Sequence, residues 1–184
     1  MTSERFEEML TGGHPNSLGR TVEVVNAVLT EPSRLAELYG CYFSADEVVR
    51  LRTSSALKRA AAQHPAWLVP YIDGLLGEVA QIDQASANWT LAQLMAMLEE
   101  WLTVDQKARA TDVMKRKLET SSDWIVLIQT MQTLATWARE DADLRSWLEP
   151  ELRRLRRDER KSVAGRATKL LASLGGYGVS TVAR

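Results

Sequence analysis

The chain has 184 residues, of which 45% are hydrophobic and 26% charged, and this favours a single globular domain. Its net charge of −1 excludes a strong overall attraction to nucleic acid or to anionic membranes. Cys41 is the only cysteine, so an intrachain disulfide is impossible. The sequence shows neither a secretory leader nor a long apolar run, and it therefore predicts a cytoplasmic protein with no membrane contact.

The charges are distributed unevenly along the chain. Residues 1–100 carry seven Lys and Arg against thirteen Asp and Glu, a net charge of −6. Residues 101–184 carry sixteen against eleven, a net charge of +5. The two halves are therefore expected to attract different partners, or each other.

Helical periodicity dominates the chain, and no segment shows the alternation typical of strands. Residues 1–16 are expected to form a short helix and a Gly-Gly-His-Pro loop, and residues 175–184 a flexible tail. Proline and capping residues divide the rest into helices. These are expected from Ser17 to Leu29, after Pro32 to Tyr39, from Ser44 to Gln63, and then starting at Pro65, Ser86, Thr103, Ser122 and Asp141–Asp143. Ser44 and Glu47 have the spacing of a capping box.

The segments also repeat. Residues 44–61 match residues 121–138 at a constant offset of 77, including Leu57 against Leu134 and Thr53 against Thr130. The helices that follow match at an offset of 80, with Trp67-Leu68-x-Pro70 against Trp147-Leu148-x-Pro150. A middle copy is expected in residues 86–120, with Leu98 in the place of Leu57 and Ala108 in the place of Leu68. A final half-copy places Val163, Ala167 and Leu171 opposite Val49, Thr53 and Leu57. A helix pair about every 40 residues is typical of α-solenoids.

At these positions the chain resembles HEAT repeats, the armadillo-like α-solenoid family. Val49-Arg50-x-x-Thr53-x-x-Ala56-Leu57 is similar to the first helix of such a repeat, and Trp67-Leu68-Val69-Pro70 is similar to the start of the second. The resemblance covers residues 17–174. It implies an all-α fold, a right-handed superhelix of about four helix pairs with a closing helix, and it implies no particular activity.

The sequence does not supply the residues that common catalytic sites need. His14 and His64 are the only histidines, which leaves too few ligands for a zinc site, and no cofactor is expected. The hydroxyl groups of Thr53, Ser54 and Ser55 have no histidine base nearby in the sequence. We therefore expect a protein that is not an enzyme.

Six tryptophans are expected to pack in the core, with Trp67 and Trp147 at equivalent positions between repeats. An alternative comes from the HEAT-like glycosylases that remove alkylated bases from DNA, which use aromatic residues and an aspartate. Asp123 beside Trp124 is the pair that could serve this role. Asp123 aligns with Asp46, however, at a position expected to cap a helix, and the chain lacks the basic excess typical of duplex binding.

The clearest functional signal is the basic run Arg153-Arg154-Leu155-Arg156-Arg157, which continues to Arg160-Lys161. Leu144, Leu148, Leu152 and Leu155 form an apolar stripe on this helix, so Arg153 and Arg157 point away from the core. In the preceding second helix, a stripe of Val104, Ala108, Thr111 and Leu118 turns Arg109 and Arg116 outward in the same way.

Second helices line the concave face of HEAT arrays, so these cations are expected to share one surface. The predicted site comprises Arg109, Arg116, Arg153, Arg156, Arg157 and Arg160, and its expected ligand is an acidic or phosphorylated protein or peptide. Nucleic-acid binding and self-assembly through the two oppositely charged halves remain alternatives.

Overall fold

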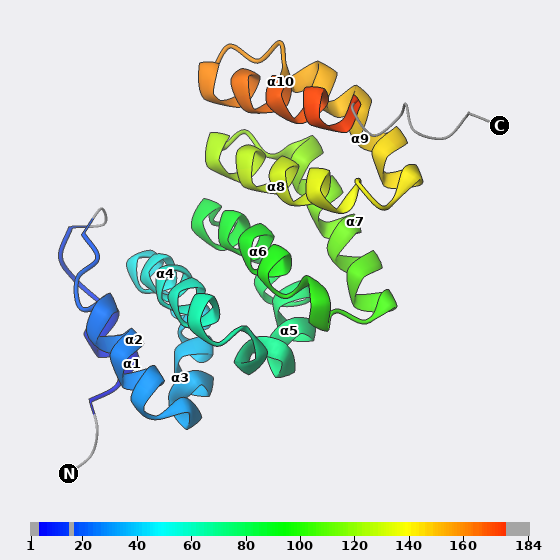
Figure 1. Cartoon of the computed structure of the whole chain (residues 1–184). Helices are drawn as coiled ribbons and strands as arrows, with labels where there is room; N and C mark the ends of the chain where they lie inside the picture. Colours follow the sequence, from blue (N-terminus) through cyan, green and yellow to red (C-terminus); the bar gives the residue numbers. More distant parts are fainter. Residues whose placement is uncertain (1–3, 15–16, 176–184) are drawn as a thin grey trace. The chain divides into compact units, whose positions relative to one another are not determined.

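Helices account for all regular secondary structure in the computed structural model, which describes residues 4–14 and 17–175 (Figure 1). These residues form ten α-helices and five short 3-10 helices, without a strand. The predicted all-α fold class is therefore confirmed, whereas the right-handed superhelix remains a prediction. No helix in these two ranges has both the length and the apolar character needed to cross a membrane.

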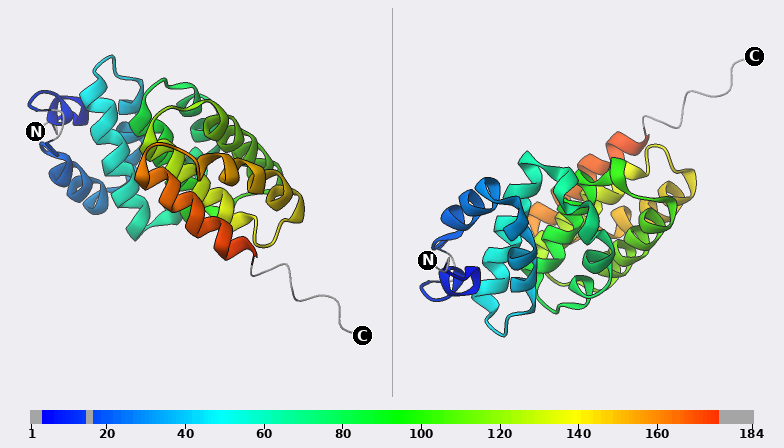
Figure 2. Two further views of the ribbon diagram at one scale, coloured as in Figure 1. Left: turned by 90° about the horizontal axis from the view of Figure 1, so that it is seen from above. Right: turned by 90° about the horizontal axis from the view of Figure 1, so that it is seen from below.

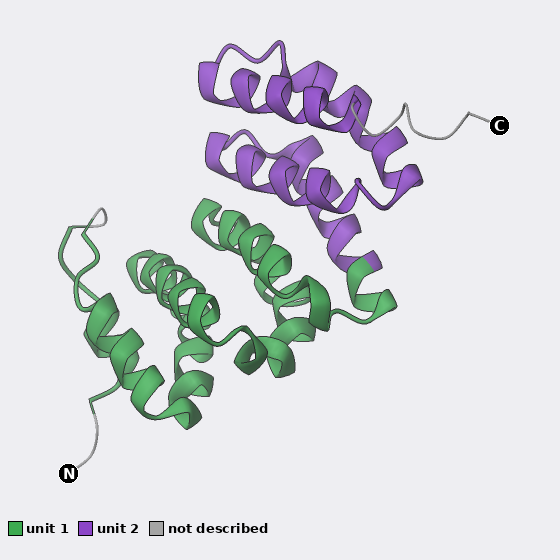
Figure 3. Ribbon diagram, viewed as in Figure 1, with its two compact units in different colours: residues 1–107 green, residues 108–184 purple. Residues whose placement is uncertain are grey.

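The chain divides into two compact units, residues 1–107 and 108–184, and α7 (Val104–Thr120) runs across the boundary between them (Figure 3). The first unit carries a net charge of −6 and the second +5, so the division by contacts coincides with the division by charge. The sequence-based division into residues 1–16, 17–174 and 175–184 remains a prediction.

In unit 1, α2 (Thr21–Thr30), α4 (Glu47–Gln63) and α6 (Ala85–Met97) pack successively against one another (Figures 1 and 2). The short helix α1 (Phe6–Leu10) buries Phe6 and Leu10 completely and packs against α2, α3 and α4. The connections contain α3 (Leu35–Gly40), α5 (Ile72–Leu76) and the 3-10 segments Pro32–Arg34, Cys41–Phe43, Pro65–Tyr71, Val79–Gln81 and Glu99–Trp101.

In unit 2, α8 (Trp124–Trp137), α9 (Ala142–Leu155) and α10 (Lys161–Gly175) form a three-helix cluster in which every pair is in contact. Buried side chains cover more than half of the circumference of α8, as expected for a helix that is packed between neighbours. Residues 176–184 of the predicted tail lie outside the described residues.

The helices α4, α6, α8 and α10 share one pattern of buried positions. The same four positions are buried in each, and they follow the helical spacing i, i+4, i+7 and i+11. These positions are Val49, Thr53, Ala56 and Ala60 in α4; Ala87, Leu91, Leu94 and Leu98 from α6 onward; Val126, Thr130, Thr133 and Trp137 in α8; and Val163, Ala167, Leu170 and Leu174 in α10. The burial pattern supports the offset of 77 between α4 and α8. It corrects the register of the middle copy, because Leu98 takes the place of Ala60 and not of Leu57.

Aspartates cap the N-termini of three helices. Asp46 accepts a hydrogen bond from the Val48 amide at 2.8 Å, and Asp123 accepts from Ile125 and Val126, both at 2.9 Å. Asp141 accepts from Leu144 at 2.8 Å. The predicted capping box of Ser44 and Glu47 is therefore wrong. Asp46 and not Ser44 caps α4, and the Ser44 hydroxyl instead accepts a hydrogen bond from the Asp46 amide, before the first residue of the helix. The predicted cap at Ser17 is also wrong, since α2 begins at Thr21, after Gly19 at a φ of +51°.

The apolar stripe predicted for α7 is displaced around the helix. Val104 is 91% exposed and Ala108 is also exposed, whereas the buried face consists of Ala110, Val113, Met114 and Leu118. Both sets have helical spacing, so periodicity alone did not separate them. Arg109 and Arg116 are exposed, as predicted.

Candidate functional site

The candidate site is the basic surface where α9 ends and α10 begins, in unit 2. The four leucines of the predicted α9 stripe, Leu144, Leu148, Leu152 and Leu155, are buried to at least 97%. They fix the orientation of the helix, and Arg153, Arg156 and Arg157 are consequently exposed. The prediction that Arg153 and Arg157 point away from the core is therefore confirmed.

Several cations of the basic run already have partners within the chain. Arg153 pairs with Glu149 at 2.8 Å, and Arg154 pairs with Glu151 at 2.8 Å while donating to the Leu118 carbonyl at 3.3 Å. Arg160 pairs with Asp158 at 2.7 Å and also donates to the Ser122 carbonyl at the start of α8. The hydrogen bonds from Arg160 hold the pKa of Asp158 down, at about 2, so this carboxylate stays ionised and occupied near neutral pH.

Four cations in the same region have no such partner. Within the described part of the chain, the side chains of Arg156, Arg157, Lys161 and Lys169 form neither an ion pair nor a hydrogen bond. Arg156 and Arg157 lie at the end of α9, and Lys161 is the first residue of α10. An anion that contacts these cations does not have to displace an internal carboxylate from them.

A hollow of about 270 Å³ lies between α8 and α10, and two of these cations, Lys161 and Lys169, line it. Its lining combines one apolar side chain from α8, Ile128, with one face of α10: Lys161, Ser162, Gly165, Arg166 and Lys169. A Cβ atom at Gly165 would meet nothing within 4 Å, so the glycine leaves the hollow wide at its middle. Arg166 donates to the Gln132 amide oxygen at 2.9 Å, which bridges the two helices. Lys161, Gly165 and Lys169 are spaced by four residues in the sequence, but this spacing alone does not predict a hollow.

Contacts between α7 and α9 show which side of each helix faces the other. Lys115 lies 4.9 Å over the Trp147 ring, and the Leu118 carbonyl accepts from Arg154. On a helix with about 100° per residue, Arg109 and Arg116 lie on a different flank of α7 from Lys115 and Leu118. A single surface containing all six predicted arginines therefore remains a prediction. Four of the six, Arg153, Arg156, Arg157 and Arg160, lie at the end of α9 or between α9 and α10.

The tryptophans are less uniformly buried than predicted. Only Trp137 is a core residue, at 2% exposure, whereas Trp124 is 48% exposed. The expectation that Trp124 packs in the core is therefore wrong. Trp101 is the last residue of the 3-10 segment Glu99–Trp101. Asp123, the partner of Trp124 in the glycosylase alternative, uses one carboxylate oxygen to cap α8. Its predicted capping role is confirmed.

The side chains of Thr53 and His64, which were considered for catalysis, are engaged in hydrogen bonding or ring stacking within the fold. Thr53 and Thr130 are buried at equivalent positions, and the Thr53 hydroxyl donates to the Val49 carbonyl at 2.8 Å. The His64 ring is stacked on Trp67, with ring centres 4.0 Å apart. No group of three or more potential metal ligands occurs within residues 4–14 and 17–175.

Comparison of the chain with protein-family models, curated proteins and solved structures found no match. The resemblance to HEAT repeats therefore rests on the sequence pattern alone. The candidate site is defined by the charges, contacts and shape of the described residues.

Proposed function

We propose that the chain is a non-enzymatic protein-interaction module that binds an acidic or phosphorylated segment of a partner protein. The observation that supports this proposal is a set of four unpaired cations: Arg156 and Arg157 follow the last residue of α9, whereas Lys161 and Lys169 lie on α10 and line the α8–α10 hollow. Arg153 and Arg160 flank the cluster and complete the basic surface. The proposed setting is the cytoplasm, and the module needs no cofactor.

The chemistry of the surface favours carboxylates and phosphates. Guanidinium groups bind both through paired hydrogen bonds, and lysine supplies a compact charge at the rim of the hollow. Each exposed ion pair contributes only about 0.2–1 kcal/mol, so recognition requires several anionic groups in one segment. A partner segment meets this requirement if it carries several spaced acidic residues and places one of its anionic groups in the hollow.

A second candidate function is binding of single-stranded nucleic acid. Trp124 is 48% exposed and precedes Ile128, which lines the hollow, by one helical turn. An exposed indole next to cations is the arrangement on which a base stacks while its phosphates contact lysine and arginine. The commitment of Asp123 to capping argues against the base-excision alternative.

Peptide titration tests the proposal. We would titrate the chain by calorimetry with a peptide of repeated Glu-Ser-Gly, with its phosphoserine form, with a Gln-Ser-Gly peptide, and with single-stranded and duplex DNA. We expect the phosphorylated peptide to bind most tightly and the Gln peptide not to bind. The double variant R156E/R157E should abolish binding while helix content by circular dichroism stays unchanged, because both side chains are exposed and unpaired.

The variant R59E is the matched control, because it reverses an exposed cation on α4 in unit 1. It should leave peptide affinity unchanged. Equal loss in both variants would mean that net charge and not this surface governs binding. Binding of single-stranded DNA that is tighter than peptide binding and depends on Trp124 would replace the proposal with its nucleic-acid alternative.

A further inference from the structure

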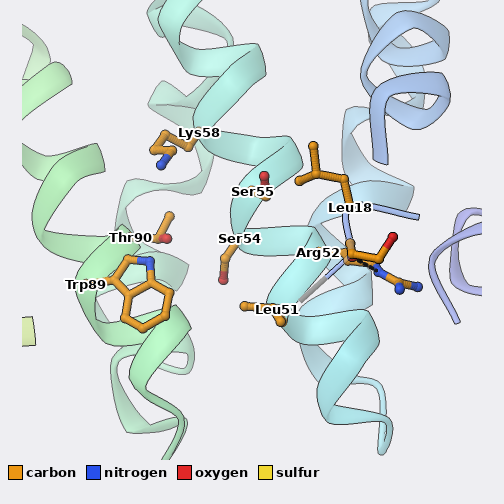
Figure 4. A pocket seen from close by; sticks show the side chains of 9 residues that line it. Leu18, Leu51, Arg52, Ser54, Ser55, Lys58, Trp89 and Thr90 are labelled. Carbon is orange, nitrogen blue, oxygen red and sulfur yellow. Dashed lines mark hydrogen bonds between the residues drawn. The ribbon is translucent and has the colours of Figure 1, made fainter. Parts of the chain in front are cut away.

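A second hollow, of about 300 Å³, lies in unit 1 between α4 and α6 (Figure 4). Leu51, Ser54, Ser55 and Lys58 from α4 form one side of it, and Trp89 and Thr90 from α6 form the other. Leu18 and Ser17, from the segment before α2, border it together with Arg52. It occupies the same place as the α8–α10 hollow in unit 2, because the aligned helices put Leu51 opposite Ile128 and Trp89 opposite Gly165.

Lys58 is the residue that distinguishes this hollow. The aligned positions in the other three helices are all alanine: Ala96, Ala135 and Ala172. Lys58 is half-buried, and among the described residues its side chain forms no ion pair and no hydrogen bond. A lysine that lines the hollow without a partner of its own can pair with an anion bound there.

The rest of the lining suits an apolar ligand, and hydroxyl groups of the chain lie on one side of the hollow. Trp89 supplies a flat ring and Leu51 an aliphatic side chain, while Leu18 is 45% exposed at the border. Ser55 and Thr90 add hydroxyl groups. Arg52 offers no second free cation, because its guanidinium group is turned toward the loop before α2 and donates to carbonyl oxygens there.

We propose that the α4–α6 hollow binds a monocarboxylate with a small apolar body, either a free acid or the C-terminal residue of a peptide. The carboxylate would pair with Lys58 and accept hydrogen bonds from Ser55 and Thr90, and the apolar body would contact Trp89 and Leu51. One free cation matches one negative charge, which disfavours a phosphate dianion. The volume is at the lower end of ligand pockets and fits a group of about the size of one amino acid.

This site is independent of the basic surface proposed above, since all of its residues belong to unit 1. Failure of either proposal therefore leaves the other intact, and the variants that test them do not overlap.

The test uses N-acetyl-leucine, the same compound as its uncharged amide, and a tetrapeptide with a C-terminal leucine in acid and amide forms. Binding is followed by NMR chemical-shift changes of the full chain. We expect both acids to shift the indole signal of Trp89, assigned with the variant W89L, with a dissociation constant on the order of 1 mM for N-acetyl-leucine. Neither amide should bind measurably. Stronger binding of the tetrapeptide acid would identify a peptide C-terminus as the source, and stronger binding of N-acetyl-leucine a free acid.

The substitution K58A introduces the residue found at the three aligned positions, so it should fold. It should weaken binding of both acids by about tenfold, whereas K169A, which makes the same change at an exposed lysine in unit 2, should leave it unchanged. The proposal is overturned if the acids leave the Trp89 signal unshifted, if acid and amide bind equally, or if K58A binds as the original chain does.

Discussion

Arg52 is buried to 98% and has no carboxylate partner among the described residues, yet its guanidinium group has several hydrogen-bond acceptors. Its Nη1 donates to the carbonyls of Leu10 at 2.6 Å and Gly12 at 2.7 Å, and its Nε donates to the Ser17 carbonyl at 3.1 Å. A Cβ atom at Gly19 would lie 2.8 Å from its Cζ. Arg52 therefore fastens the loop between α1 and α2 onto α4, and it requires glycine at the close approach.

Replacing Arg52 with methionine should lower the free energy of unfolding by roughly 2–4 kcal/mol, because it leaves several carbonyl groups without donors. Lysine should recover only part of the loss, since one ammonium group cannot span these acceptors. Urea denaturation measures the change. The neighbouring R59M replaces an exposed arginine and should be nearly neutral. A loss in R52M no larger than that in R59M would show that the carbonyl cluster does not stabilise the fold.

Asp158 competes with any external anion for Arg160. The substitution D158N removes the carboxylate that Arg160 contacts at 2.7 Å, so it should raise the affinity for the Glu-Ser-Gly peptide about threefold. Calorimetric titration measures the gain. E159Q is the matched control: it removes the same charge one residue further along, where no hydrogen bond to Arg160 is formed, and its effect should be smaller. Equal gains in both variants would show that general charge, and not release of Arg160, is responsible.

The N-termini of α4 and α8 share the same arrangement of capping hydrogen bonds. Asp46 and Asp123 cap their helices, and the serine two residues earlier, Ser44 or Ser121, accepts a hydrogen bond from the aspartate amide. The Asp46 carboxylate also accepts from the Thr11 hydroxyl at 2.8 Å, a contact with the loop before α2 that has no counterpart in unit 2. The two caps are thus equivalent within their helices but differ in their surroundings.

We predict that D46A and D123A each lower the free energy of unfolding by about 1 kcal/mol, the usual cost of losing a helix cap. D123N should be nearly neutral, because asparagine caps well. Thermal denaturation followed by circular dichroism gives the comparison. S44A should cost less than D46A, and the reverse order would restore the capping box in place of the aspartate cap.

The elements also show what the sequence could and could not predict. The leucine stripe of α9 and the C-terminal end of α4 followed from helical periodicity and proline, because these act locally. The stripe of α7 was misplaced because small or polar residues such as Ala108 and Thr111 fit a core face and a solvent face equally well. The partners of Arg52 lie 35 to 42 residues away in a loop, and the two hollows depend on how helices pack, so no local pattern indicated them.

In the whole molecule, the two compact units carry opposite net charges, and this suggests how copies of the chain interact. Residues 1–107 form a compact unit with net charge −6, and residues 108–184 one with net charge +5. We propose that the acidic unit of one copy attracts the basic unit of another, in competition with any acidic peptide. A contact of this kind is heterologous, so it can extend from copy to copy without closing.

We predict weak, salt-sensitive self-association. Charges act over about 30 Å at 0.01 M salt but only about 8 Å at 0.15 M, so attraction between whole units is strong in the first condition and mostly screened in the second. Sedimentation equilibrium should therefore show a mass that rises with concentration at low salt and a monomer at 0.15 M. R156E/R157E should remain monomeric in both, because it lowers the charge of unit 2 from +5 to about +1. A mass that rises equally at both salt concentrations would contradict the electrostatic origin and would point to apolar contacts, for which the exposed Trp124 is the first residue to replace.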